Sequence, residues 1–212
     1  MTSNLVIAVV VAATLPAFSK KSTSDVRITI RIMDYVNIPA VERAEVQTNA
    51  KRILGQAGVA VAFVDCFIAG VATGDETCRN PLGPVDFDLR ISPPKQSMKG
   101  ELGYAAMSPD GGAIVTVFID PRRRKARAGN LSNGVIVGHA VAHEIGHLLL
   151  GPNSHSAAGI MRPVWRPVDE EWMAQGGLLF DQRQASRMRS ALIERLSRSN
   201  AAPPTKPASA YE

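Results

Sequence analysis

An apolar stretch in the second half of the chain carries two histidines and a glutamate, and it limits the possible folds more than any other feature. The stretch covers residues 135–150 and contains an HExxH sequence at His143, Glu144 and His147. Its length and composition predict a largely buried helix. Histidines four residues apart lie on one face of a helix, so their imidazoles can converge on one metal ion. Without a metal, burying these three polar side chains would be costly.

A third metal ligand is expected beyond the end of this helix. Gly151 can end the helix through a left-handed residue, so the chain can turn and bring His155 back to the first two histidines. Three histidine nitrogens and an open fourth position describe a catalytic zinc site. On the helix, Glu144 lies about 100° around from His143, where it can touch a metal-bound water without ligating the metal.

Other side chains could complete or support this site. An acidic cluster downstream, Asp169, Glu170 and Glu171, is the alternative source of a third ligand. His139 lies one helical turn before His143 on the same face. We expect His139 to have a supporting or core role rather than to ligate the metal.

The composition fits a single globular domain. The chain has 212 residues, of which 45% are hydrophobic and 20% charged. The net charge is +5, and the one dense basic run, at 122–127, has little aromatic interleaving and no nucleic-acid motif. That run predicts a solvated loop, and we expect a monomer with no nucleic-acid partner.

The N-terminus predicts export. Residues 5–15 are an apolar run too short for a membrane span, and Ala17 and Ser19 offer small residues for cleavage. We therefore expect a signal peptide at 1–19, a secreted or periplasmic protein, and no stable membrane span after cleavage. A retained N-terminal anchor or a buried first strand is the alternative.

The two cysteines are compatible with an oxidising compartment. Cys66 and Cys78 are twelve residues apart and could close a small loop by a disulfide. Neither lies in a CxxC pair, so a cysteine zinc site is not expected. Free buried thiols are the alternative.

Hydrophobic periodicity predicts the order of the elements. Strand patterns cover 26–32, 59–68, 86–91 and 113–119, and a helical stripe runs from Val46 to Ala57. The first two strands with this helix predict a parallel βαβ unit. A second helical region, 168–197, is interrupted near Gly176, and residues 201–212 predict a disordered tail.

The motif as a whole resembles the metzincin clan of zinc peptidases, and is closest to the matrixin-like pattern. The likeness rests on the HExxH residues with Gly151, His155 and the sequence Gly159-Ile160-Met161. The usual clan spacing is HExxHxxGxxH, whereas this chain reads HExxHxxxGxxxH and is two residues longer. In the clan a methionine-containing turn (the Met-turn) lies beneath the zinc, and Met161 is the matching residue.

The resemblance implies a fold and a mechanism. The fold would be α+β and zincin-like: one domain at 20–200 with a mixed twisted sheet, a long active-site helix and a C-terminal helix. One zinc ion held by His143, His147 and His155 would activate water, with Glu144 as general base. A peptide or protein substrate would lie along an edge strand, expected within 113–119. A structural calcium ion is left open, without support from the sequence.

The expected function is therefore that of an exported zinc endopeptidase. Two alternatives remain: another zinc hydrolase, such as an endoribonuclease, and a catalytically inactive binding protein of the peptidase fold. Glu144 argues against both, because a three-histidine ribonuclease site or a purely structural site has no need of it.

Overall fold

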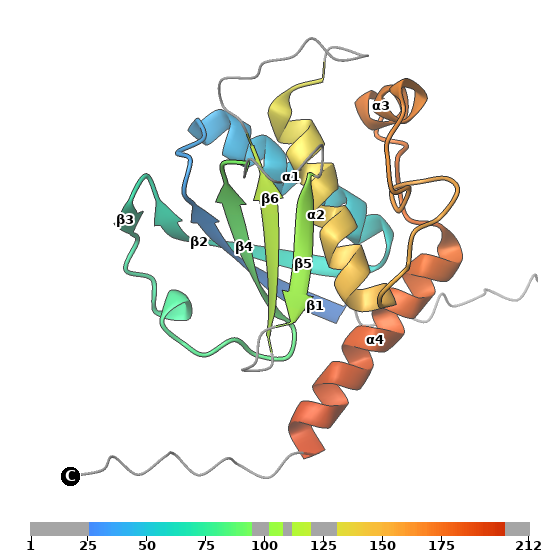
Figure 1. The fold of residues 1–212 in the computed structure, drawn as a ribbon. Coiled ribbons are helices and arrows are strands. Elements are labelled where there is room, and N and C mark those ends of the chain that lie inside the picture. Colours follow the sequence, from blue (N-terminus) through green and yellow to red (C-terminus); the bar gives the residue numbers. More distant parts are fainter. Residues whose placement is uncertain (1–25, 95–101, 108–111, 120–130, 202–212) are drawn as a thin grey trace, which may run out of the picture.

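The computed structural model describes residues 26–94, 102–107, 112–119 and 131–201. Within these ranges the chain is α+β, as expected, with one six-stranded mixed sheet and four α-helices (Figure 1). The strands are β1 (Val26–Asp34), β2 (Val59–Ile68), β3 (Val71–Ala72), β4 (Asp86–Ser92), β5 (Gly103–Met107) and β6 (Ala113–Phe118). The helices are α1 (Ala40–Gln56), α2 (Asn133–Leu150), α3 (Pro167–Ala174) and α4 (Gln182–Ala201), with a short 3-10 helix, η1 (Glu76–Cys78).

The sheet has four parallel strands flanked by one antiparallel strand at each edge. Its order is β3-β2-β1-β4-β6-β5, and only β3 and β5 run antiparallel to their neighbours. The parallel pairing of β1 and β2 around α1 confirms the predicted βαβ unit. Alternate β1 residues, Ile28, Ile30 and Ile32, are fully buried, which explains the apolar–polar alternation of this strand.

The edge strand is not the one predicted. Residues 113–119 were expected at the edge, but β6 lies inside the sheet between β4 and β5. Val115 and Val117 of β6 are buried, as are most of the residues beside them. A strand this apolar belongs to the interior of the sheet, whereas β5, which carries glycine and alanines, forms the edge.

Helices α1 and α2 pack closely on each other beside the sheet (Figure 1). Glycine makes this close approach possible. A Cβ atom on Gly138 of α2 would lie 2.7 Å from the Asn49 Cβ and 2.9 Å from the Val46 carbonyl oxygen of α1. The close packing fixes the position of α2, and therefore of the histidines it carries.

Arginines of α4 bind the C-terminal ends of α1 and α2. The Arg187 guanidinium donates to the Leu150 carbonyl at 2.8 Å, and Arg195 donates to the Leu148 carbonyl. Arg189 donates to the Ala57 carbonyl at 2.7 Å. The last carbonyls of a helix lack partners within the helix and carry partial negative charge, so these cations stabilise both ends.

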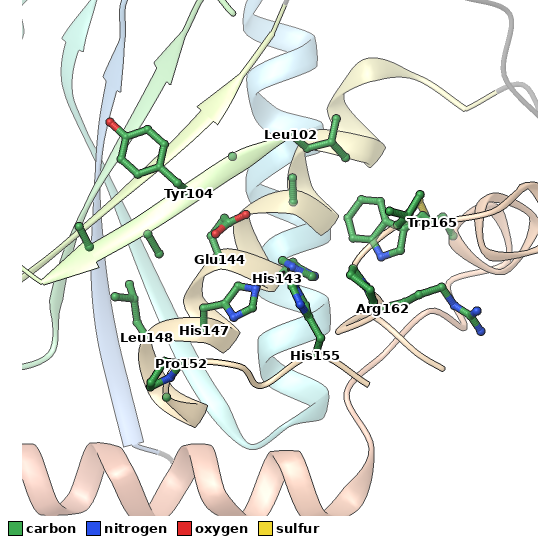
Figure 2. Close-up of a pocket in the computed structure, with 18 of the residues that line it drawn as sticks. Leu102, Tyr104, His143, Glu144, His147, Leu148, Pro152, His155, Arg162 and Trp165 are labelled. Atoms are coloured by element: carbon green, nitrogen blue, oxygen red, sulfur yellow. Dashed lines mark hydrogen bonds between the residues drawn. The ribbon is translucent and has the colours of Figure 1, made fainter. Parts of the chain in front are cut away.

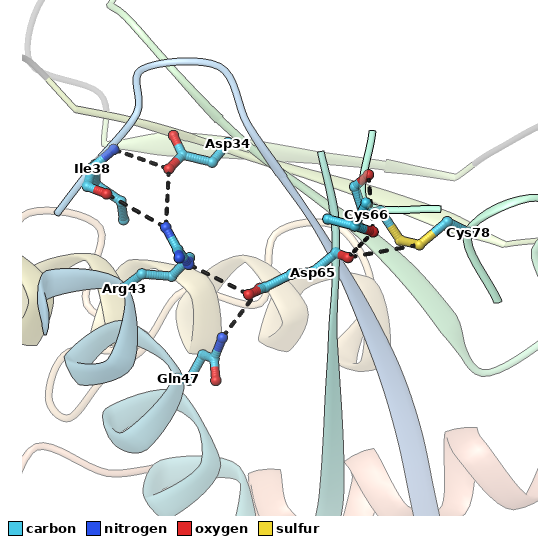
Figure 3. A network of polar contacts seen from close by, with 8 residues as sticks. Asp34, Ile38, Arg43, Gln47, Asp65, Cys66 and Cys78 are labelled. Atoms are coloured by element: carbon cyan, nitrogen blue, oxygen red, sulfur yellow. Dashed lines mark hydrogen bonds and ion pairs between the residues drawn. A yellow bond between two sulfur atoms is a disulfide. The ribbon is translucent and has the colours of Figure 1, made fainter. Parts of the chain in front are cut away.

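A polar network and a disulfide hold the C-terminal ends of β1 and β2 (Figure 3). The buried Asp34 carboxylate accepts from the Ile38 amide at 2.9 Å, and Arg43 lies 3.8 Å from it and 3.5 Å from Asp65. A disulfide joins Cys66 of β2 to Cys78 of η1, which confirms the predicted pair.

Several boundaries differ from the predicted ones. Helix α2 begins at Asn133, two residues early, because the Ser132 hydroxyl accepts from the Val135 amide and caps it. Between β2 and β4 lie β3 and η1, which the sequence patterns did not predict, and α4 extends through Ala201, where the tail was expected to begin. The predicted signal peptide at 1–19, the basic run at 122–127 and residues 202–212 lie outside the described ranges. Within those ranges no helix is long and apolar enough to cross a membrane.

Candidate metal centre

Three histidines converge at the C-terminal end of α2 (Figure 2). His143 and His147 come from the helix, and the chain after it brings back His155. One ring nitrogen of each lies within 4.8 Å of the others, and the Nε2 atoms of His143 and His147 are 3.0 Å apart. In the described part of the chain this is the only group of three or more such side chains that could hold a metal ion.

The acidic alternative has a different role in this structure. The Asp169 carboxylate accepts from the Arg166 amide at 2.9 Å and lies 3.2 Å from Arg162 Nε. It therefore caps α3 and binds arginine. Glu170 lines the same cleft as the histidines but does not belong to their cluster, and neither does Glu171.

The outer nitrogen of His143 is fixed by a backbone carbonyl. His143 Nδ1 lies 2.7 Å from the Ile160 carbonyl oxygen, which can only accept a hydrogen bond. The ring must therefore carry its proton on Nδ1 and present the Nε2 lone pair to the cluster. His147 Nδ1 lies 3.0 Å from the Ser154 hydroxyl, so its outer nitrogen is also engaged. This donor set fits a metal ion, whose imidazole ligands typically hold their second nitrogen in such a bond.

Burial keeps two of the ligands in the form that binds metals. Burial, which disfavours the charged imidazolium, is the main reason why the pKa of His143 is lowered. It is also the main reason why the pKa of His147 is lowered to about 4. For His147 the neighbouring histidines lower the pKa further. Both imidazoles are thus neutral at pH 7, and their lone pairs are available to a cation.

Glu144 lies beside the histidines, between α2 and β5 (Figure 2). Its side chain is 7% exposed and faces the cleft. The strand opposite gives it room through Gly103. A Cβ atom there would lie 3.2 Å from Glu144 Oε1 and 2.6 Å from the Thr116 carbonyl oxygen, so no larger residue fits without movement.

Gly151 is what allows the chain to leave α2 and turn back. Its φ of 92° and ψ of 176° lie in a region that essentially only glycine adopts. The turn is thus made by an extended positive-φ glycine rather than by the left-handed helical residue expected. The Gly151 amide still donates to the His147 carbonyl at 3.0 Å, so the helical hydrogen-bond pattern continues to this glycine.

Met161 is fully buried beneath α2, in a turn closed by the Arg162 amide on the Gly159 carbonyl at 3.2 Å. A Cβ atom on Gly146 would lie 2.6 Å from Met161 Sδ, so the thioether rests against the helix at this glycine. Gly146 lies between His143 and His147 in the motif. The turn therefore supports the part of α2 that carries the two histidines.

Two aromatic neighbours have separate roles. His139 is fully buried, and its Nδ1 lies 2.7 Å from the Val135 carbonyl oxygen. It is outside the metal cluster, as expected. Trp165 donates from Nε1 to the Ile160 carbonyl at 3.0 Å and lines the cleft. The same carbonyl therefore binds both Trp165 and His143.

The histidines and Glu144 share one cleft of about 900 Å³. One wall is the whole of β5, and the other is built by α2, the turn after Met161 and part of α3 (Figure 2). The walls include Leu102, Gly103, Ala105, Pro152, Pro163 and Trp165.

Sequence reasoning missed two contributors to this site, Gly103 and Ser154. No local pattern marks Gly103, because its contact with Glu144 crosses between separate elements. Ser154 lies inside the lengthened connection between the second and third histidines, which was the available signal. No protein-family model matches the chain, and no curated protein matches it.

Proposed function

We propose that this chain is an exported zinc-dependent endopeptidase. The observation that carries the proposal is the presence of three convergent histidines and Glu144 in one cleft whose wall is an edge strand. Imidazole donors suit zinc among the divalent metals, and three of them leave a position open for water or substrate. The predicted signal peptide and the Cys66–Cys78 disulfide support export.

The edge strand supports a peptide as the substrate. The Phe118 amide donates to the Leu102 carbonyl at 2.8 Å, which makes this pair hydrogen-bonded in the β5–β6 ladder. Because such pairs alternate, Gly103, Ala105 and Met107 direct their amides and carbonyls away from β6. An extended peptide can add to such an edge as a further strand.

The chain's own residues would carry the proton transfers. Bound zinc would supply Lewis acidity to the attacking water and the scissile carbonyl. Glu144 would accept the proton that the water loses on attack and pass it to the leaving amine. The hydrogen bond from His143 to Ile160 would hold the first ligand in place during turnover. Residues 20–200 would form the catalytic domain, and Met161 would be its Met-turn residue.

The test pairs Glu144→Gln with a matched control. Because Glu144 is the proposed base, hydrolysis of a peptide library should fall by at least about 10²-fold in Glu144→Gln. Zinc content, measured by elemental analysis, should stay unchanged. Glu171→Gln is the same substitution at an exposed position of α3 and should keep wild-type activity.

Other outcomes would contradict the proposal. Full activity of Glu144→Gln would show that Glu144 is not the general base. A wild-type protein that contains no zinc would show that the hydrolysis is not zinc-dependent. Cleavage of RNA without cleavage of peptides would favour the endoribonuclease alternative. Zinc binding with neither activity would favour a binding protein.

A further inference from the structure

We propose that Ser154, supplied by the lengthened connection after α2, is a positioning residue for the second metal ligand. The inference rests on the proposed function, because it requires a metal among the three histidines. It goes further by giving a role to the segment that departs from the spacing of the clan. The carrying observation is the 3.0 Å contact between the Ser154 hydroxyl and His147 Nδ1 (Figure 2 shows His147 and this connection).

The two helical ligands obtain their outer hydrogen bonds from different sources. His143 Nδ1 donates to a backbone carbonyl, that of Ile160, which any residue at this position would offer. His147 depends on a side chain instead. Without the Ser154 hydroxyl, the Nδ1 proton would lose its partner, and the ring could rotate or take the other tautomer. Either change would turn the Nε2 lone pair away from the metal.

The conformation of the connection determines where the hydroxyl lies. Gly151 and Asn153 both have positive φ, 92° and 57°. These two residues turn the chain back towards His147. Ser154, which lies seven residues after His147 and beyond the end of α2, therefore contacts the imidazole of His147. The connection is longer than the clan's usual one by two residues, and besides the third histidine it provides a hydroxyl for the second.

In the bound state the hydroxyl oxygen would accept from His147 Nδ1–H, which leaves Nε2 unprotonated for the metal. Partners of this kind fix the ring orientation and raise the basicity of the ligand, and their loss typically weakens metal binding by about 10–100-fold. Ser154 is not among the residues that line the cleft. Its effect should therefore be on the metal rather than on the substrate.

The test compares Ser154→Thr with Ser154→Val in the full chain. Threonine and valine have nearly the same shape and branching, so the pair differs only in the hydroxyl. The zinc dissociation constant, measured by competition with a chromophoric chelator, should stay near the wild-type value in Ser154→Thr. It should rise by about 10–100-fold in Ser154→Val. The visible absorption of bound Co²⁺ should change in Ser154→Val and not in Ser154→Thr.

A control and a second measurement separate this role from folding. Ser156→Ala removes a hydroxyl from the same segment that donates to the Ala158 carbonyl at 2.6 Å, and it should leave zinc affinity unchanged. Thermal unfolding of the metal-free proteins should not distinguish the Thr and Val variants. Equal zinc affinity of these two variants, with zinc bound to the wild type, would overturn the role of Ser154 alone. A wild-type protein that binds no zinc would overturn the proposed function as well.

Discussion

At the scale of single residues, two glycines are as specific to the site as the histidines. Gly103 leaves room for the Glu144 carboxylate, and Gly146 leaves room for the Met161 thioether. In both cases a Cβ atom would meet another element closer than ordinary van der Waals contact allows. Helix α2 is thus held between a strand on one side and a turn on the other.

Replacing Gly103 by alanine should affect catalysis more than metal binding. The new methyl group would collide with the Thr116 carbonyl and press on Glu144, which would move the proposed base. We expect peptide hydrolysis to fall by about 10²-fold or more, since a displaced base loses most of its contribution. Zinc content should remain at the wild-type level. The control Gly55→Ala has open space around its Cβ and should be fully active.

His139 should make stability depend on pH. Burial lowers its pKa from 6.5 to about 4, so between these values the unfolded chain binds a proton that the folded chain does not. Stability is therefore complete above pH 6.5 and declines as the pH falls towards 4, by up to about 3 kcal/mol for this group. Urea unfolding of chelator-treated protein should show this slope, and His139→Leu should reduce it. An unchanged slope in His139→Leu would contradict the assignment.

At the scale of elements, the local patterns predicted helices and strands but not their neighbours. The HExxH spacing predicted the convergence of His143 and His147, because the geometry of one helix fixes it. The edge strand was predicted wrongly, because strand order depends on pairings such as β4 with β6 that no local pattern records. No local pattern predicts the contact of the Ser154 hydroxyl with His147 or the contacts of the α4 arginines with the ends of α1 and α2.

The contact of Arg195 with the end of α2 should contribute to stability. Its guanidinium donates to the Leu148 carbonyl, 47 residues away, and lies over the Phe87 ring. Arg195→Met keeps much of the aliphatic stem but loses the charged hydrogen bond, which should cost about 1.5–3 kcal/mol. Chemical denaturation should show this loss. Arg183→Met, at an exposed position of the same helix, should change stability by less than about 0.5 kcal/mol.

At the scale of the whole molecule, the two edges of the sheet differ: one is fixed by covalent and ionic contacts, and the other borders the cleft. Near one edge, the disulfide ties β2 to η1, and the Asp34–Arg43–Asp65 network holds the C-terminal ends of β1 and β2. At the other edge, β5 faces the cleft and the histidines. The sequence predicted the α+β class, the parallel unit of β1, α1 and β2, and the long and C-terminal helices. It did not predict the full strand order, because pairings such as β1 with β4 and β4 with β6 join separate parts of the chain.

The three histidines also differ in exposure: His143 is buried, His147 half-buried and His155 exposed. The two inner rings belong to α2, whereas the outer one belongs to the connection that follows it. A departing ion would therefore leave His155 first. An arriving ion would first bind the two imidazoles of α2, which already lie side by side. The rate of metal exchange would thus depend on the movement of this one exposed side chain.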